Sequence, residues 1–120
     1  MITDSAFIAS ADATLAAIGS ALDAALAADG NESDNDLDWR LIDGILEIEC
    51  ADGSKLIVNR HVPNREIWVA ARSGGFHFRA EGGAWRDTRS GGELAVQLAR
   101  LLHDQAGLDV DLTRLPGPTA

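Results

Sequence analysis

The chain has 120 residues, of which 46% are hydrophobic and 24% charged, and its formal net charge is −9. This length and composition are typical of one globular domain and exclude a disordered chain. The single cysteine, Cys50, excludes an internal disulfide and a cysteine-based zinc cluster, and it fits a reducing compartment.

The negative charge is concentrated in the first half of the chain. Residues 1–52 contain twelve acids and one base, a net charge of −11, whereas residues 53–120 contain seven acids and nine bases, a net charge of +2. Nucleic-acid binding requires a basic surface, so the expected partners do not include nucleic acid. No continuous apolar run approaches the roughly 20 residues that cross a bilayer, and the N-terminal segment lacks the basic residues of a targeting peptide. We therefore expect a cytosolic protein with no membrane partner.

Residues 5–28 are predicted to form a helix, because apolar residues recur at steps of three and four in an alanine-rich segment. Thr3 or Asp4 can cap its start, and Asp29-Gly30 is expected to end it. The buried stripe is predicted to contain Phe7, Ala11, Leu15, Ile18, Leu22 and Leu26.

Short segments of β-forming residues, separated by turn signals such as Asp-Gly, fill the middle of the chain. They predict strands at 37–42, 45–51, 55–60, 65–71, 74–80 and 84–87. Side chains alternate between the two faces of a strand. The alternation directs Leu37, Trp39, Leu41, Leu46, Ile48 and Cys50 toward the helices, and Asp36, Asp38, Arg40, Glu47 and Glu49 away from them.

A second helix is expected after Ser90, which together with Glu93 fits a capping box; Gly107 is expected to end this helix. The order helix, strands, helix predicts an α+β fold, a two-layer α/β sandwich. In it an antiparallel sheet of about six strands carries the N- and C-terminal helices on one face. We expect one domain over residues 1–112 and a flexible C-terminal tail over 113–120.

Acidic residues crowd the entrance to the first strand. If Asp43-Gly44 forms a two-residue turn, Arg40 faces Glu47, and Asp38 faces Glu49 as an unfavourable pair of like charges. Carboxylates are hard oxygen ligands, so a bound cation would relieve the repulsion, and iron, calcium, magnesium or manganese would all fit. The alternative is a solvated acidic edge that keeps a neighbour's strand away.

The spacing Asp34, Asp36, Asp38 also matches the opening of a calcium-binding EF-hand loop. That motif requires Gly at its sixth position and Glu at its twelfth, where this chain has Trp39 and Ile45. We reject an EF-hand.

The strand over 65–71 places Trp68 on the face of the sheet that lies away from the helices. With a one-residue bulge at Asp52-Gly53-Ser54, Asn59 and His77 share that outer face. A large aromatic side chain on an open sheet is typical of an interface anchor. The alternative is a partly shielded surface tryptophan without a partner.

The sequence lacks the usual signs of an enzyme. The three histidines match no zinc spacing, and neither a G-x-S-x-G motif nor a phosphate-binding loop is present. Cys50 lies in the inward register of its strand, so we expect a buried small hydrophobe and no nucleophile.

The run DGSKLIVNRHVPNREIWVAARSGGFHF (52–78) resembles the signature of the frataxin domain, in its bacterial CyaY branch. The matching features are the Asn-Arg pair before a Pro-Asn turn, the Ile-Trp-Val strand, and the Ser-Gly-Gly step into an aromatic strand; the similarity extends over roughly residues 4–112. The resemblance implies a bacterial cytoplasmic protein with helices on one side of a flat antiparallel sheet. It also implies weak iron binding through an acidic ridge, and docking on the cysteine desulfurase and its scaffold protein in iron–sulfur cluster assembly.

On this resemblance we expect a non-enzymatic iron-binding protein of iron–sulfur cluster assembly that acts as iron donor or sensor and regulates the desulfurase. Weakly bound Fe²⁺ or Fe³⁺ is the expected cofactor, with other divalent cations as alternatives. The expected state is a monomer, with iron-induced oligomers as an alternative. The candidate metal ligands are Asp23, Asp29, Glu32, Asp34, Asp36, Asp38, Glu47 and Glu49, and the candidate partner-binding residues are Asn59, Trp68 and His77.

One departure from the family pattern concerns the end of the first helix, where bacterial members usually carry two or more acids. This chain has Ile18-Gly19-Ser20-Ala21 there, followed by Asp23. Two alternatives stay open: an acidic docking adaptor that binds no metal, and a ferroxidase-like enzyme. The ferroxidase would need helix-borne Glu and Glu-x-x-His spacings, which neither predicted helix has.

Overall fold

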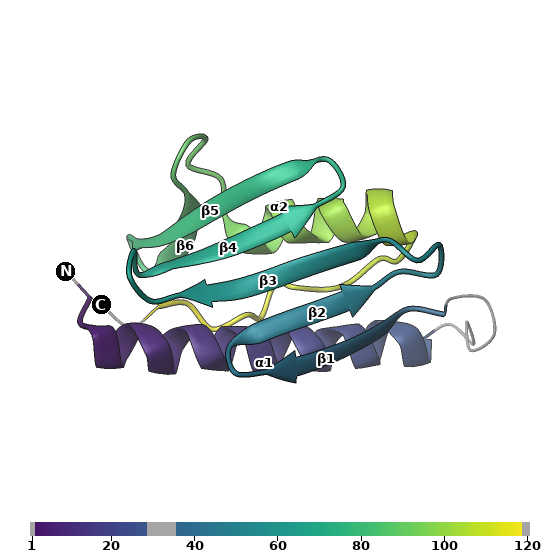
Figure 1. Cartoon of the computed structure of the whole chain (residues 1–120), viewed down its shortest axis with the longest axis horizontal. Helices are drawn as coiled ribbons and strands as arrows, with labels where there is room; N and C mark the ends of the chain where they lie inside the picture. Colours follow the sequence, from purple (N-terminus) through teal and green to yellow (C-terminus); the bar gives the residue numbers. More distant parts are fainter. Residues whose placement is uncertain (1, 29–35, 119–120) are drawn as a thin grey trace.

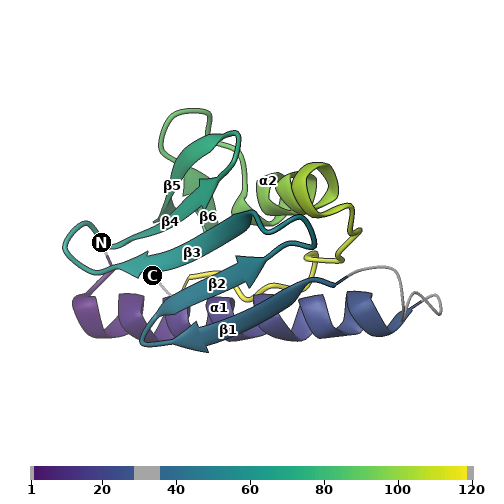
Figure 2. The ribbon, with the colours of Figure 1, turned by 45° about the vertical axis from the view of Figure 1, so that its right-hand side comes forward.

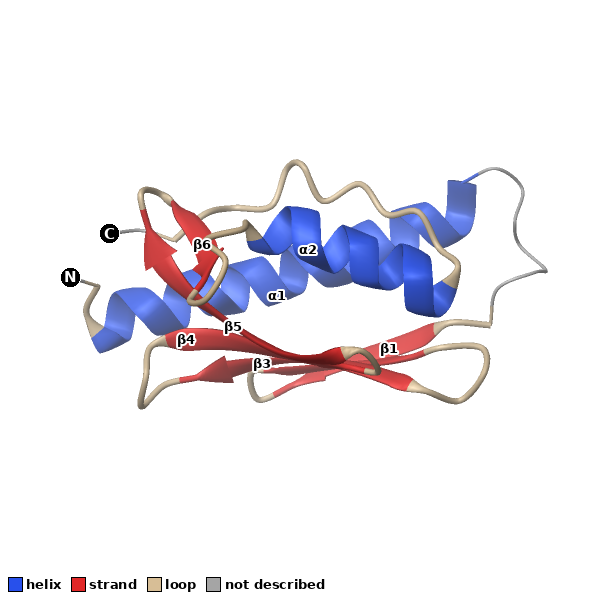
Figure 3. Ribbon diagram, turned by 90° about the horizontal axis from the view of Figure 1, so that it is seen from above, coloured by secondary structure: helices blue, strands red, loops and turns tan. Residues whose placement is uncertain are grey.

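The computed structural model of the chain describes residues 2–28 and 36–118, and in this part an antiparallel sheet carries helices on one face (Figures 1 and 3). The six strands follow each other in the order β1-β2-β3-β4-β5-β6. This arrangement confirms the predicted two-layer α+β sandwich. The elements are α1 (Asp4–Ala27), β1 (Asp38–Ile42), β2 (Ile45–Glu49), β3 (Lys55–His61), β4 (Glu66–Ala71), β5 (Gly74–Glu81), β6 (Ala84–Asp87), α2 (Leu94–Leu101) and the π-helical turn η2 (Leu102–Ala106).

Helix α1 begins at the cap residue Thr3, whose Oγ1 accepts a hydrogen bond from the Ala6 N–H at 3.1 Å. Its apolar stripe packs on the sheet, and the side chains of Phe7, Leu15 and Ile18 are fully buried. By length and mean hydropathy, α1 is the one helix of the described residues that is long and apolar enough to cross a membrane. The helix is nevertheless interrupted by Asp12 and Asp23, so it contains no continuous apolar run of that length, and its apolar stripe is buried in the core of the domain.

The sheet has one buried and one open face, as the alternation predicts (Figure 3). Leu46, Ile48, Leu56, Val58 and Ile67 on the helix side are fully buried. The turn between β1 and β2 is a two-residue turn in which Asp43 (φ 52°) and Gly44 (φ 76°) both have positive φ. Asp-Gly is a preferred sequence for this turn, and it fixes the register of the hairpin.

Helix α2 begins differently from the predicted capping box. Its cap residue is Glu93, which makes no side-chain cap hydrogen bond. The Ser90 Oγ instead accepts hydrogen bonds from the Gly92 N–H and the Gln97 Nε2–H, at 3.2 and 2.9 Å. The nearly buried Asp87 accepts from the N–H groups of Arg89 and Ser90. The capping box was wrong because the helix begins three residues later than expected, with Glu93 as its cap, and because the Ser90 N–H that Glu93 would accept is donated to Asp87.

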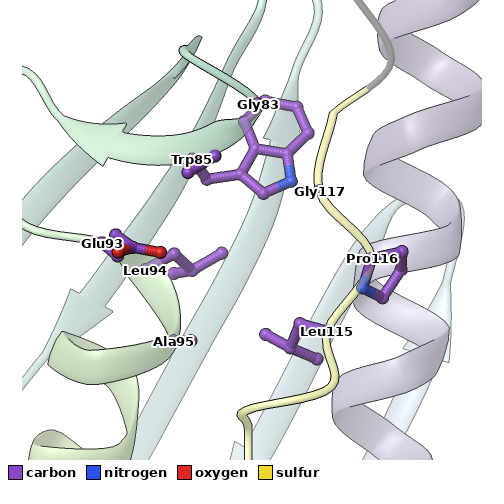
Figure 4. Close-up of a pocket in the computed structure, with 9 residues that line it drawn as sticks. Gly83, Trp85, Glu93, Leu94, Ala95, Leu115, Pro116 and Gly117 are labelled. Carbon is purple, nitrogen blue, oxygen red and sulfur yellow. The ribbon is translucent and has the colours of Figure 1, made fainter.

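The segment after η2 runs back along the helices, on the side away from the sheet (yellow in Figures 1 and 2). Its described part includes residues 113–118, which the sequence predicts as a flexible tail. The Thr14 hydroxyl of α1 accepts from Trp85 Nε1 at 3.0 Å and lies 3.1 Å from the Pro116 carbonyl oxygen. Around this junction Trp85, Leu94 and Leu115 line a small cavity between β6, α2 and the segment (Figure 4). The segment therefore contacts α1 at Pro116.

Candidate functional site

The first candidate surface is the acidic edge, which we define as Asp36, Asp38, Glu47 and Glu49 on the β1–β2 side together with Asp23 of α1. The hairpin register pairs Arg40 with Glu47 and Asp38 with Glu49, as predicted. Asp38 and Glu49 are both exposed. The like charges therefore face each other in solvent, where repulsion is small.

Glu47 differs from the other acids because two bases engage it. Lys55 Nζ lies 2.7 Å from one carboxylate oxygen, and Arg40 Nη2 lies 3.2 Å from the other. The hydrogen bond from Lys55, and then that from Arg40, lowers the pKa of Glu47. Glu47 is thus neutralised within the sheet, and it would have to release both partners to bind a cation.

Asp23 of α1 is linked to the acidic edge by a hydrogen bond from Trp39, the β1 side chain that lies against α1. The Trp39 Nε1–H donates to Asp23 Oδ1 at 2.8 Å. The indole crosses the helix at Gly19, where an added Cβ would lie 2.6 Å from the ring. This contact gives a structural reason for a small residue at Gly19.

The described residues contain no group of three or more His, Cys, Asp or Glu side chains placed to hold a metal ion. A shallow hollow at the edge is lined by Trp39 and by charged side chains of both signs: Asp38, Arg40, Glu47, Glu49 and Lys55. Asp29, Glu32 and Asp34 lie outside the described residues. The described part of the edge can attract cations electrostatically, and it does not form a closed coordination site.

The second candidate surface is the tryptophan face, which we define as Asn59, His61, Trp68 and His77 on the open side of the sheet. Trp68 pairs with Asn59 of β3 and with His77 of β5, which confirms the predicted placement of these three residues on one face. The Trp68 indole lies between two imidazoles: the ring centroids are 3.6 Å apart for His61 and 4.3 Å for His77, and both pairs are 9° from parallel. The outcome is a stack of three nearly parallel rings on the open face of the sheet, in which the two imidazoles cover the faces of the indole.

Glu66, which lies two residues before Trp68 on the same face of β4, holds this stack in position. Its side chain is nearly buried and accepts from Trp68 Nε1 at 2.8 Å and from Arg79 Nη2 at 3.1 Å. Burial alone would raise the pKa of Glu66, but the hydrogen bonds from Trp68 and Arg79 outweigh burial and hold the pKa below its ordinary value. The indole is therefore oriented by an ionised carboxylate, which limits the conformations available to an interface side chain.

His61 and Glu66 were absent from the predicted site. Strand alternation could have found both, because His61 lies two residues after Asn59 and Glu66 two residues before Trp68. Cys50 is buried, as expected for a small hydrophobe.

Comparison with known proteins agrees with this architecture. The family model of the frataxin-like domain matches residues 1–108. The iron–sulfur cluster assembly protein CyaY of Dechloromonas aromatica is 53% identical over 105 residues, 87% of this chain and 92% of that protein. The protein of the same name from Ralstonia nicotianae is 45% identical over 111 residues, 92% of this chain and 95% of that protein.

Solved structures show the same fold. Frataxin from Psychromonas ingrahamii is 30% identical and covers 94% of this chain and all of its own, with a TM-score of 0.74. Trimeric yeast frataxin, complexed with ferrous iron, is 24% identical and covers 82% of this chain and 86% of its own, with a TM-score of 0.68. The chain belongs to the frataxin family, in its bacterial CyaY branch.

Proposed function

We propose that this chain is an iron-binding protein of iron–sulfur cluster assembly in the bacterial cytoplasm. It docks on the cysteine desulfurase and its scaffold protein and regulates the desulfurase. In this assembly it acts as iron donor or iron sensor. Two bacterial relatives are named iron–sulfur cluster assembly proteins, and one structural neighbour is described in complex with ferrous iron. The proposed role is capture and docking, so it requires no catalytic side chain in this protein.

The observation that carries the docking step is the Trp68 stack. The indole, whose two faces are covered by the imidazoles, belongs to a rigid, partly exposed aromatic cluster on the open face of the sheet, and the hydrogen bond to Glu66 holds it in one orientation. Such a side chain loses little conformational entropy on binding and excludes water over a large area, which are the properties of interface hot spots. Asn59, beside it on β3, supplies an amide for hydrogen bonding to the partner.

The iron step rests on the acidic edge. Asp36, Asp38 and Glu49 are exposed, and none of them forms an ion pair with a base among the described residues. A cation placed near the Asp38–Glu49 pair would replace repulsion by attraction, and open carboxylates suit weak, exchangeable binding of hard cations. We include Asp23, Asp29, Glu32, Asp34 and Glu47 in the proposed ligand set.

The docking step can be tested with purified desulfurase–scaffold complex from the same organism. We expect Trp68→Ala to weaken binding at least tenfold, because truncation of a central aromatic hot spot commonly costs more than 1.4 kcal/mol. Arg100→Ala is the control, because Arg100 is exposed on α2, on the other layer. Equal affinity of the two variants would reject docking through the tryptophan face.

A second candidate is the acidic docking adaptor without physiological metal. It is favoured by the neutralisation of Glu47 and by the lack of a three-ligand cluster among the described residues. Neutralising Asp36, Asp38 and Glu49 together should remove iron binding if the edge captures iron. The matched control neutralises the same number of exposed acids elsewhere, Glu81, Glu93 and Asp104. Loss of desulfurase binding with unchanged iron affinity in the first variant would identify the adaptor.

A further inference from the structure

The tip of the β1–β2 hairpin carries an apolar patch that the proposed docking step does not use. Ile42 and Ile45 face each other across the turn, and their exposed fractions are 59% and 45%. In the described part of the chain, Val96 is the other large hydrophobic residue with comparable exposure. Exposed aliphatic residues that adjoin one another on a regular surface are typical of contact sites.

The patch continues the tryptophan face. Ile42 pairs with Ile45, Ile45 with Asn59, Asn59 with Trp68, and Trp68 with His77, so these side chains form one row across β1–β5. Side chains opposite each other in a sheet point to the same face. A partner that covers Trp68 along this row therefore reaches the isoleucines.

The hairpin tip is held rigidly before any partner arrives. The Arg60 N–H donates to the Gly44 carbonyl oxygen at 2.9 Å, and the Arg60 guanidinium lies beneath the turn, 2.6 Å from a Cβ placed at Gly44. The same guanidinium pairs with Asp12 of α1 at 2.5 Å. A preorganised surface loses less entropy on binding, which favours a contact role over a mobile loop.

The chemistry around the patch defines what it would recognise. Ile42 and Ile45 border a hollow that is also lined by Arg40, Asp43 and Glu47. Glu47 is neutralised by Arg40 and Lys55. The exposed Asp43 forms no ion pair or hydrogen bond with any other described residue, so its charge is available to a partner.

We propose that Ile42, Asp43 and Ile45 form a second contact point of the docking face, which receives an aliphatic side chain flanked by Lys or Arg from the protein that covers Trp68. This inference rests on the proposed function, because it assumes a protein partner at Trp68. The isoleucines supply the apolar contact, and Asp43 pairs with the flanking base.

The test measures affinity for the desulfurase–scaffold complex by titration calorimetry, with folding of every variant checked by circular dichroism. The double variant Ile42→Thr/Ile45→Thr keeps β-branched side chains and should weaken binding on the order of tenfold. Asp43→Asn should weaken it about threefold and reduce its salt dependence, because rim charges act mainly through electrostatic steering. Val96→Thr, an equally exposed site on α2, should leave affinity within about twofold.

The outcomes separate the two proposals. Full affinity of the double isoleucine variant, together with loss of binding in Trp68→Ala, overturns the second contact point and leaves docking at Trp68 standing. Full affinity of Trp68→Ala rejects docking through the tryptophan face, and with it the premise of this inference. Analytical ultracentrifugation measures self-association of the parent and of the double variant. If the double variant abolishes self-association and keeps full affinity for the desulfurase–scaffold complex, the patch joins two copies of this chain. That result overturns the inference.

Discussion

The imidazole of His61 lies flat on the indole of Trp68, with ring centroids 3.6 Å apart and planes 9° from parallel. Aromatic contacts of this kind contribute about 0.5 to 1.5 kcal/mol beyond the area they bury. We therefore expect His61→Ala to reduce the free energy of unfolding by about 1 kcal/mol and to increase quenching of Trp68 fluorescence by acrylamide. His103→Ala, which removes an exposed imidazole paired with Asp109, is the control. Unchanged stability and quenching in His61→Ala would show that the stack contributes nothing in solution.

Glu66 makes a pH-dependent contribution to stability. Its pKa in the folded protein lies below the ordinary value of 4.5, so the folded state favours the ionised form. The resulting stabilisation is fully present above pH 4.5 and is lost as the pH falls through the lower folded pKa. Urea unfolding should show Glu66→Gln less stable than the parent by about 1 to 2 kcal/mol at pH 7, with the difference shrinking below pH ~4. If the difference in the free energy of unfolding between the parent and Glu66→Gln does not depend on pH, the stabilisation by Glu66 comes from the shape of its side chain and not from its charge.

Gly19 allows the Trp39 indole to lie on α1. A methyl group at this position would meet the ring at 2.6 Å, so the ring must move. Although alanine favours helix over glycine by about 1 kcal/mol, overpacking costs about 1 to 3 kcal/mol, and we expect Gly19→Ala to be net destabilising. The indole N–H resonance of Trp39 should shift as its hydrogen bond to Asp23 is disturbed. Ser20→Ala, at the adjacent exposed site, should change neither observable; a stabilised Gly19→Ala would show that the ring moves freely.

Thr14 joins three parts of the chain through one buried hydroxyl. It accepts from Trp85 Nε1 and lies within hydrogen-bond distance of the carbonyl oxygens of Ser10 and Pro116. Thr14→Val preserves shape and leaves the Trp85 N–H without its acceptor, so we expect a loss of about 1 to 3 kcal/mol in the free energy of unfolding. Thr88→Val, at an exposed site, is the control. Equal stability of the two variants would mean that water replaces the hydroxyl.

The fold and its faces were predictable because they depend on local patterns. Alternation and the Asp-Gly turn suffice to place Trp68 outside and to pair Asp38 with Glu49, and both predictions are confirmed. Contacts between distant segments gave no local signal. The bond from Trp39 to Asp23 and the packing at Pro116 both depend on which side chains tertiary structure brings together.

The capping box shows why a local motif can mislead. Ser90 and Glu93 have the correct spacing, but the helix begins after Glu93, and the Ser90 N–H donates to Asp87 instead of to Glu93. The metal ligands show a different limit. Glu47 is acidic in sequence and is neutralised by Arg40 and Lys55 in the sheet, whereas Asp29, Glu32 and Asp34 lie outside the described residues and stay predictions.

Amide chemical-shift mapping with unlabelled desulfurase tests the central claim most directly, namely that the open face of the sheet is where this protein meets the assembly machinery. On addition of the desulfurase to ¹⁵N-labelled protein, we expect the largest changes at Asn59, Trp68 and His77 and along β1 and β2, with α2 unaffected. Changes confined to α2 and the segment that follows it, with Trp68 unmoved, would contradict the claim.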